Sequence, residues 1–379
     1  MKFLIAPNAL KGSLSSIRAA TIIAETLQRV DSNAETYLCP IADGGNGTLD
    51  CLIRATEGHL HTMTVRGPLP SRKVTARWGV LGDGTTAVIE MAEAAGLHLL
   101  QQSEYDVFHT STVGVGELIG EAMSRGYRRI LIGLGGSATN DGGIGCARAL
   151  GVKFIDNQGE ELNGGGIDLA RIDKIDYANV LLAIKDVEFV GLSDVSNVLC
   201  GPRGAAHTFA AQKGATANEI GELDKGLRHY ASIIERDSQR DISNIPGSGA
   251  AGGLGAGLIA FLGAMIVSGI DFVLDALRFD SLVQECDCII TAEGAIDAQT
   301  TFGKGVEGIS RRAHLFNKPV HVLAGRIDGN TRALQQQLGL ASLSQISPDD
   351  IPRDVAMRNA EIYLSKSVES FFLSIKSEK

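Results

Sequence analysis

The chain has 379 residues, a length that favours two domains over a single hydrophobic core. Apolar residues make up 44 % of it and charged residues 21 %, proportions typical of soluble globular proteins. A net charge of −9 argues against binding to nucleic-acid phosphates or to an anionic membrane surface, because both need basic patches.

Short apolar runs alternate with runs of helical period along nearly the whole chain. In chain order we expect a strand at 2–6, a helix at 16–30, strands at 36–42 and 86–92, a helix at 114–126, strands at 129–136, 187–195, 288–294 and 319–325, and a closing helix at 353–375. This alternation predicts an α/β protein whose parallel sheets are covered by helices.

Two changes of composition suggest where the domains meet. The segment 66–80 starts rich in Pro and Gly, and short buried strands resume near residue 285. We therefore expect an outer domain built from residues 1–68 and 285–379, with residues 69–284 inserted as a second domain.

One long uncharged segment, 246–270, has the length needed to span a bilayer. Its first half is mostly Gly and Ala, and it lacks basic or aromatic flanks, so we interpret it as a buried glycine-rich loop and helix. The first residues lack the pattern of a cleaved signal peptide. The six cysteines form no CxxC pair, which favours free thiols in a reducing cytoplasm.

Five loops share a pattern that points to a bound anion. Each follows an apolar run and combines Gly with charged or hydroxyl residues; they span 6–16, 41–48, 133–143, 193–215 and 291–305. In open α/β sheets, loops that leave the carboxyl ends of strands line a crevice. Glycine lets backbone N–H groups approach a ligand there, and helix N-termini attract phosphate.

The charges in these loops suit the transfer of a phosphoryl group. Lysines neutralise phosphate oxygens, and aspartates hold Mg²⁺ or accept a proton from a hydroxyl nucleophile. Any one of them has an ordinary alternative, since a lone Lys is usually a surface charge and a lone Asp before Gly a turn or cap. Their recurrence favours a shared site that contains Lys11, Lys213, Lys304, Asp43, Asp141, Asp194, Glu293 and Asp297.

Other phosphate- and nucleotide-binding patterns do not fit. No Walker A loop occurs, and the GxGxxA match at Gly255, Gly257 and Ala260 does not follow a strand. No GxSxG elbow, HExxH helix or protein-kinase HRD set is present.

Taken in order, the loops resemble the class I glycerate kinase family. The resemblance covers essentially the whole chain and rests mainly on "GGSATNDGGIGCARALG", "CGPRGAAHTFAAQKGA" and "GAAGGLGAGLIAFLGA". It implies a flavodoxin-like domain made from both chain ends and an inserted α/β domain of restriction-endonuclease-like topology. It also implies transfer of the ATP γ-phosphoryl group to D-glycerate with Mg²⁺, with 2-phosphoglycerate as the product.

The chain departs from the family pattern inside these loops. It has "NALKGSL" for "DSFKGSL", "ADGGNGT" for "ADGGEGT", "DVSNVL" for "DVDNPL" and "AEGAID" for "GEGRID", so the altered positions include Asn8, Asn46, Ser196 and Ala295. Asn8 and Asn46 offer Mg²⁺ a neutral oxygen in place of a carboxylate. The missing Arg at position 295 is a natural clamp for a substrate carboxylate, which leaves the substrate open.

Three functions therefore remain open from the sequence. They are a glycerate kinase, a kinase of another small hydroxy acid or one that makes 3-phosphoglycerate, and a catalytically silent binder of glycerate or nucleotide. A silent protein would tend to lose Lys11, Asp194 and Lys213, and all three are present.

We expect MgATP and the hydroxy acid to bind in a cleft between the domains. Asp194, with Asp43 as second choice, is the expected base or metal ligand, while Lys11 and Lys213 neutralise the phosphoryl group. The expected metal ligands are Asp43, Asp194 and Asp297. The expected substrate- and phosphate-binding residues are Ser13, Gly44, Gly45, Gly135, Gly136, Ser137, Asn140, Asp141, Arg203, Glu293, Asp297 and Lys304. A homo-oligomer is compatible with the sequence.

Overall fold

The computed structural model describes residues 1–297, 300 and 305–377. The chain divides into two compact units, an outer unit of Met1–Asp43 with Ile270–Lys379 and an inserted unit of Gly44–Gly269. These boundaries differ from those expected at 68 and 285. Residue 68 lies in the turn of a hairpin whose strands pair from His59↔Val80 to Arg66↔Lys73, so no boundary can fall there.

The second boundary lies earlier than expected because the segment before residue 285 belongs to the outer core. Ile270, Leu274 and Phe279 pack with Leu4 and Ile289 in one buried cluster. The expected break near 285 marks only the start of a strand.

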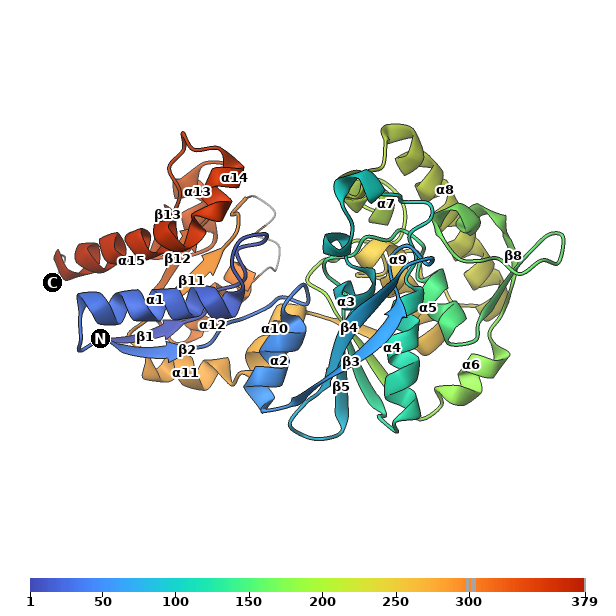
Figure 1. Cartoon of the computed structure of the whole chain (residues 1–379), viewed down its shortest axis with the longest axis horizontal. Helices are drawn as coiled ribbons and strands as arrows, with labels where there is room; N and C mark the ends of the chain where they lie inside the picture. The colour runs from blue at the N-terminus through green and yellow to red at the C-terminus, as the bar shows by residue number, and fades with distance from the viewer. Residues whose placement is uncertain (298–299, 301–304, 378–379) are drawn as a thin grey trace. The chain divides into compact units, whose positions relative to one another are not determined.

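The outer unit is a parallel five-stranded sheet in the order β13-β12-β11-β1-β2. Helices α1 and α15 contact each other and cover one face, while α10, α11 and α12 cover the other (Figure 1). The strands are β1 Lys2–Ile5, β2 Glu35–Leu38, β11 Cys288–Glu293, β12 Val320–Ala324 and β13 Ser342–Gln345. The helices are α1 Ser16–Val30, α10 Gly269–Ala276, α11 Phe279–Glu285, α12 Gly305–Leu315, α13 Thr331–Gln337, α14 Arg353–Arg358 and α15 Ala360–Ser377.

The inserted unit is built on a six-stranded sheet in the order β10-β9-β6-β5-β4-β3. Its strands are β3 His59–Arg66, β4 Lys73–Val80, β5 Thr86–Glu90, β6 Arg129–Gly133, β9 Glu188–Leu192 and β10 Met265–Val267. Strands β5, β6, β9 and β10 are parallel, so their carboxyl ends share one edge, whereas β3 and β4 form an antiparallel hairpin. A separate ribbon pairs β7 Lys153–Asp156 with β8 Ile172–Asp176.

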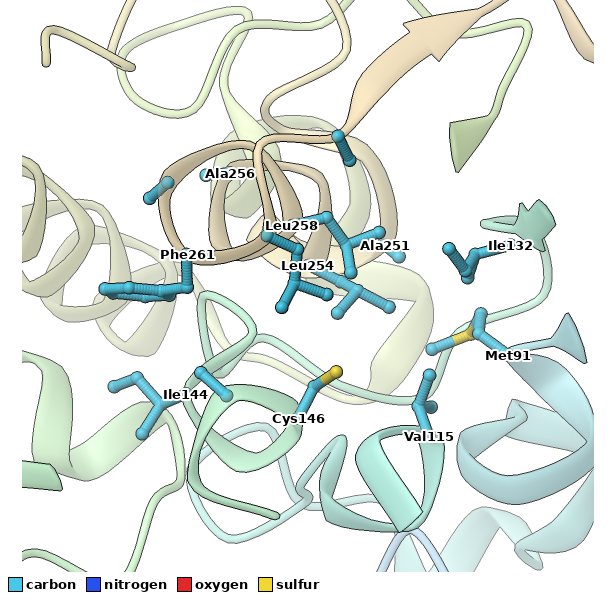
Figure 2. Close-up of a cluster of buried hydrophobic side chains, with 14 of the residues drawn as sticks. Met91, Val115, Ile132, Ile144, Cys146, Ala251, Leu254, Ala256, Leu258 and Phe261 are labelled. Carbon is cyan, nitrogen blue, oxygen red and sulfur yellow. The ribbon is translucent and has the colours of Figure 1, made fainter. Parts of the chain in front are cut away.

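Helices cover this sheet, and the glycine-rich segment 246–270 lies among them. The helices are α2 Thr48–Thr56, α3 Ala92–Ala95, α4 Val113–Ser124, α5 Ile144–Ala149, α6 Ala178–Ala183, α7 Ala205–Phe209, α8 Ala217–Ser238 and α9 Ala250–Leu262. Figure 2 shows Leu254 and Phe261 of α9 in the same buried cluster as Ile144 and Cys146 of α5. The interpretation as a buried loop and helix is confirmed for residues 247–262, whereas 265–267 form strand β10, in which Met265 is exposed.

Two further expectations concern the membrane and the cysteines. In the part of the chain that the structure describes, no helix is long and apolar enough to cross a bilayer. All six cysteines are free thiols, as expected from their spacing.

Candidate active site

Three loops of the inserted unit, those that contain Gly44, Gly135 and Ser193, meet at the carboxyl ends of β5, β6 and β9. The amide of Gly135 donates to the carbonyl of Gly44 at 2.9 Å, and that of Leu134 donates to the carbonyl of Leu192 at 3.1 Å. A Cβ at Gly44 would lie 2.6 Å from the Leu192 carbonyl oxygen, and a Cβ at Gly135 would overlap the Cα of Gly45. Only glycine lets these loops pack so closely, so the structure brings the expected Gly44, Gly45 and Gly135 together.

The buried side chain of Asp141 fixes the turn that follows Gly135 by hydrogen bonds to the backbone around it. Its carboxylate is fully buried and accepts hydrogen bonds from the amide and hydroxyl of Thr112, at 2.7 and 2.8 Å, and from the amides of Gly143 and Gly145, at 3.1 and 3.2 Å. Burial raises its pKa, while these donors oppose the rise. Because its oxygens bind protein donors, Asp141 fastens the turn to α4 and α5, which is not the exposed position expected of a phosphate-binding residue.

Lys213 also lies behind the turn instead of on its surface. It ends a short 3-10 helix, is 2 % exposed, and donates from Nζ to the Ser137 hydroxyl at 2.8 Å and to the Thr139 carbonyl at 2.7 Å. Burial lowers the pKa of Lys213 to about 7, against the opposing charge of Asp141. Lys213 is therefore not in the exposed position expected of a residue that contacts a phosphoryl group directly; its Nζ contacts Ser137, whose side chain is only partly buried.

The next residues of the turn are buried polar groups without partners. Among the described residues, neither the Thr139 hydroxyl nor either side-chain polar atom of Asn140 has a hydrogen-bond partner, and the same holds for the Ser248 hydroxyl. Asn140 is 0 % exposed, so its side chain is enclosed and does not lie on the surface where a phosphate would bind. A Cβ at Gly252 would overlap the Thr139 carbonyl oxygen, which shows how closely the start of α9 packs on this turn.

Glu90 is a buried acid that sequence reasoning missed, because the run 86–92 was interpreted only as a strand. It is the last residue of β5 and 4 % exposed, and its Oε2 accepts from the amides of Gly47 at 3.0 Å and Leu49 at 3.2 Å. These amides begin α2, where no intrahelical acceptor is available. Burial raises the pKa of Glu90 to about 7 despite the two amides, and the charge of Glu93 adds to the rise. The signal available in the sequence was the acidic residue Glu90 at the end of an apolar run that predicts a buried strand.

Asp194 lies at the same edge of the sheet, directly after β9. Its Oδ1 accepts from the hydroxyl of Ser268, which follows β10, at 3.0 Å. The amide of Ser193 donates to the carbonyl of Val267 at 3.0 Å, which joins the ends of the two strands. The side chain of Arg203 is exposed in the loop that follows Asp194.

The outer unit gathers its own polar residues at the carboxyl ends of β1 and β11. Asn8 is 6 % exposed and donates from Nδ2 to Oε2 of Glu293 at 3.0 Å. A Cβ at Gly294 would lie 3.0 Å from the amide of Lys11, whose side chain is exposed. An Asp at position 8, as in the family pattern, would put two carboxylates against each other, whereas the amide of Asn8 pairs with Glu293.

Four further residues that the sequence predicts for the site belong to the outer unit. The Ser13 hydroxyl donates to the Leu10 carbonyl at 2.9 Å, and Asp43 is partly buried after β2. Oδ1 of Asp297 accepts from the amide and hydroxyl of Thr300 at 3.1 and 3.2 Å. Lys304 lies outside the described residues.

A hollow of about 540 Å³ lies at the opposite, amino-terminal ends of β5 and β6 and is lined by Gly84, Thr85 and 125–129. Its arginines already bind protein groups, for example Arg125 to Glu121 and Arg129 to Glu188. It contains none of the expected site residues.

Comparison with known proteins identifies the family. The family model described as the glycerate kinase family matches residues 3–376. The chain belongs to the glycerate kinase family. It is 41 % identical to the glycerate kinase of Bacillus subtilis (strain 168), covering 100 % of this chain and 99 % of the relative. It is also 41 % identical to the glycerate 2-kinase of Escherichia coli (strain K12), covering 95 % of this chain and 94 % of the relative.

The fold of this glycerate kinase family member is similar to a solved structure. The crystal structure of a protein described as glycerate kinase 2 from Salmonella typhimurium LT2 superposes with a TM-score of 0.82 at 37 % identity. The match covers 100 % of this chain and 99 % of the Salmonella chain. The α/β fold expected from the sequence is confirmed.

Gly135→Ala is expected to lower the kinase activity of this family member about 100-fold, because misplacing the glycine loops by about 1 Å can cost that much. The new Cβ would overlap the Cα of Gly45, so one loop must move. We expect steady-state kinetics to show the loss, with the far-UV circular dichroism spectrum unchanged. Gly221→Ala on α8 is the control, since its Cβ would meet nothing within 4 Å. Equal activity of the two variants would contradict the prediction.

Proposed function

We propose that the protein transfers the γ-phosphoryl group of ATP to a hydroxyl of D-glycerate, giving 2-phosphoglycerate. The observation that carries this proposal is the packing of Gly44 and Gly45 onto Gly135 at the carboxyl edge of the inserted sheet, in a chain that belongs to the glycerate kinase family. Such glycine loops present amides to phosphate oxygens at low steric cost.

Each remaining residue has a role that its position supports. The amides of Gly44, Gly45 and Gly136 and the Ser137 hydroxyl bind phosphate oxygens, while the amide of Gly135 holds the two loops together through the Gly44 carbonyl and Lys213 supports Ser137 from behind. Lys11, exposed on the outer unit, supplies a mobile positive charge. Arg203, also exposed, pairs with the carboxylate of the acid, since Ala295 stands where the family pattern has Arg.

Mg²⁺ fits the donors that the chain offers. The structure, where described, holds no cluster of three or more His, Cys, Asp or Glu side chains that could cage a metal ion. Mg²⁺ in kinases is usually bound through one or two carboxylates together with substrate phosphates, so a complete protein cage is not required. Asp43, Asp194 and Asp297 are the carboxylates that we propose to hold it. When bound, the ion neutralises charge on the phosphoryl oxygens.

The topology and location that we propose follow from the same observations. The order β2-β1-β11-β12-β13 corresponds to the 2-1-3-4-5 order of flavodoxin-like sheets, which supports that topology for the outer unit. For the inserted unit, the mixed sheet and the family resemblance support a restriction-endonuclease-like topology. The free thiols support a cytoplasmic location.

A coupled assay of ADP release with D-glycerate, L-glycerate, tartronate and glyoxylate tests the function. We expect ADP release to be fastest with D-glycerate, and phosphorus NMR of the product to show phosphate on C2. Faster release with another acid would favour the second candidate, a kinase of a different hydroxy acid, which the Ala at position 295 favours. If the protein bound glycerate or ATP but released no ADP in the presence of any of the four acids, it would be a silent binder, and the proposal would be contradicted.

A further inference from the structure

Glu90 has a buried carboxyl group that no step of the proposed function uses. Its Oε2 is fixed by the amides of Gly47 and Leu49, and its Oε1 carries no hydrogen bond to the described residues. Two donors on one oxygen leave the other oriented and able to accept a proton. The two amides therefore fix the orientation of the carboxyl group but leave Oε1 able to accept a further hydrogen bond.

Glu90 lies next to the two glycine loops, at the carboxyl edge of the inserted sheet. It pairs with Gly133 at the end of β6, directly before the 134–137 turn. A Cβ at Gly133 would lie 3.1 Å from the Gly44 carbonyl oxygen and 3.9 Å from the Cα of Glu90. Both loops that we assign to phosphate binding thus start beside this residue.

The charged groups around Glu90 keep its carboxyl group poised to exchange a proton near neutrality. Glu93 of α3 and Asp50 of α2 add negative charge. Arg77 of β4 binds both of these acids, at 2.6 Å from Nη2 to Glu93 Oε1 and 2.8 Å from Nη1 to Asp50 Oδ1. Nδ1 of His98 lies 3.4 Å from Nδ2 of Asn46, in the loop that contains Gly47. With burial as the main cause, the pKa of Glu90 is raised to about 7, which is the range in which a general base works best.

We propose that Glu90 is the catalytic base, accepting the proton of the acceptor hydroxyl on Oε1, which leaves Asp194 to hold the metal. This inference rests on the proposed kinase function. The acceptor oxygen forms a bond to the γ-phosphorus as the bond from that phosphorus to the β,γ-bridging oxygen breaks and ADP leaves. The hydroxyl proton passes to Oε1 of Glu90 and then to water. The amides of Gly47 and Leu49 keep the carboxylate oriented throughout.

Glu90→Gln tests this assignment, because an amide oxygen can still accept from Gly47 and Leu49 while the side chain can no longer take up a proton. For the wild type we expect kcat to rise tenfold per pH unit at low pH and to level off above about pH 7, the pKa of Glu90. For Glu90→Gln we expect kcat at pH 8 to be about 100-fold lower, the acidic limb to vanish, and KM for both substrates to change little.

Glu93→Gln is the second variant and does not depend on the folding of the first. Removing the negative charge of Glu93 should move the acidic limb of the wild-type profile to lower pH while its plateau stays within about threefold. An unmoved limb, or a Glu90→Gln enzyme that keeps the wild-type kcat and limb, would overturn the assignment. So would a Glu90→Gln enzyme that loses substrate binding but keeps the limb, since that marks a structural role.

The wild-type assay separates this failure from failure of the kinase function itself. The acid used is whichever one the wild type phosphorylates fastest. If the wild type phosphorylates none, both proposals fall together, whereas an active wild type with an unaffected Glu90→Gln variant removes only Glu90 from the reaction.

Discussion

Replacing Asp141 with Ala is expected to lower the free energy of unfolding by about 3–5 kcal/mol, the usual cost of removing one partner from a buried charged network. The change leaves the amides of Thr112, Gly143 and Gly145 buried without this acceptor, and it removes the negative charge that stabilises the buried Lys213 ammonium. Urea unfolding followed by circular dichroism measures the loss.

The matched control is Asp186→Ala, which removes an exposed aspartate of the same unit and should change stability by less than about 0.5 kcal/mol. Asp141→Asn should fall between the two, because its amide oxygen still accepts from the backbone while its NH₂ faces other donors. An Asp141→Ala midpoint equal to that of the control would show that the carboxylate does not hold the turn.

Asp194→Asn is expected to lower kcat about 100-fold, equivalent to about 2.7 kcal/mol of transition-state stabilisation. Asn keeps an oxygen that accepts from the Ser268 hydroxyl, so the local geometry is retained, but it loses the charge that holds Mg²⁺. The measurement is kcat over a series of Mg²⁺ concentrations, which should show a higher requirement for the ion.

Asp186→Asn serves as the control for charge alone, since it removes the same charge from an exposed position. Its kcat and Mg²⁺ requirement should match the wild type. Near-normal turnover of Asp194→Asn at low Mg²⁺ would exclude Asp194 from metal binding and from any role as base.

The sequence predicted the buried parallel strands well because such strands are continuously apolar. The expected strands at 2–6, 129–136 and 288–294 contain β1, β6 and β11. The expected strand at 36–42 ends at Leu38, two residues before a proline that cannot donate to a ladder. The β3–β4 hairpin went unrecognised because Val65 is the one fully buried residue of β3, so the strand carries little hydrophobic signal.

The helix α8 was also missed, although its start carries a capping box in which the Thr216 side chain and Glu219 each bind the other's backbone amide. That pattern was available in the sequence. The buried residues Leu223, Leu227, Tyr230 and Ile234 of the helix recur at helical spacing, so the periodic signal was available as well.

The sequence located the glycine loops but not the depth of their side chains. Lys213 and Lys11 occupy similar polar loops, yet one is buried and the other exposed. A smaller contrast separates the fully buried Asp141 from the partly buried Asp194. The difference arises from long-range packing, such as the start of α9 against Thr139, which no local pattern records.

The discontinuous outer unit constrains how the chain folds as it leaves the ribosome. Strand β1 forms near the start, but its partner β11 is made much later; Asn8 and Glu293, for example, are 285 residues apart. The inserted unit is one continuous stretch and can fold as soon as it is synthesised, while β1 and β2 wait with an unpaired edge. The first 43 residues therefore keep an exposed strand edge, which is prone to pairing with other chains, until β11 has been synthesised.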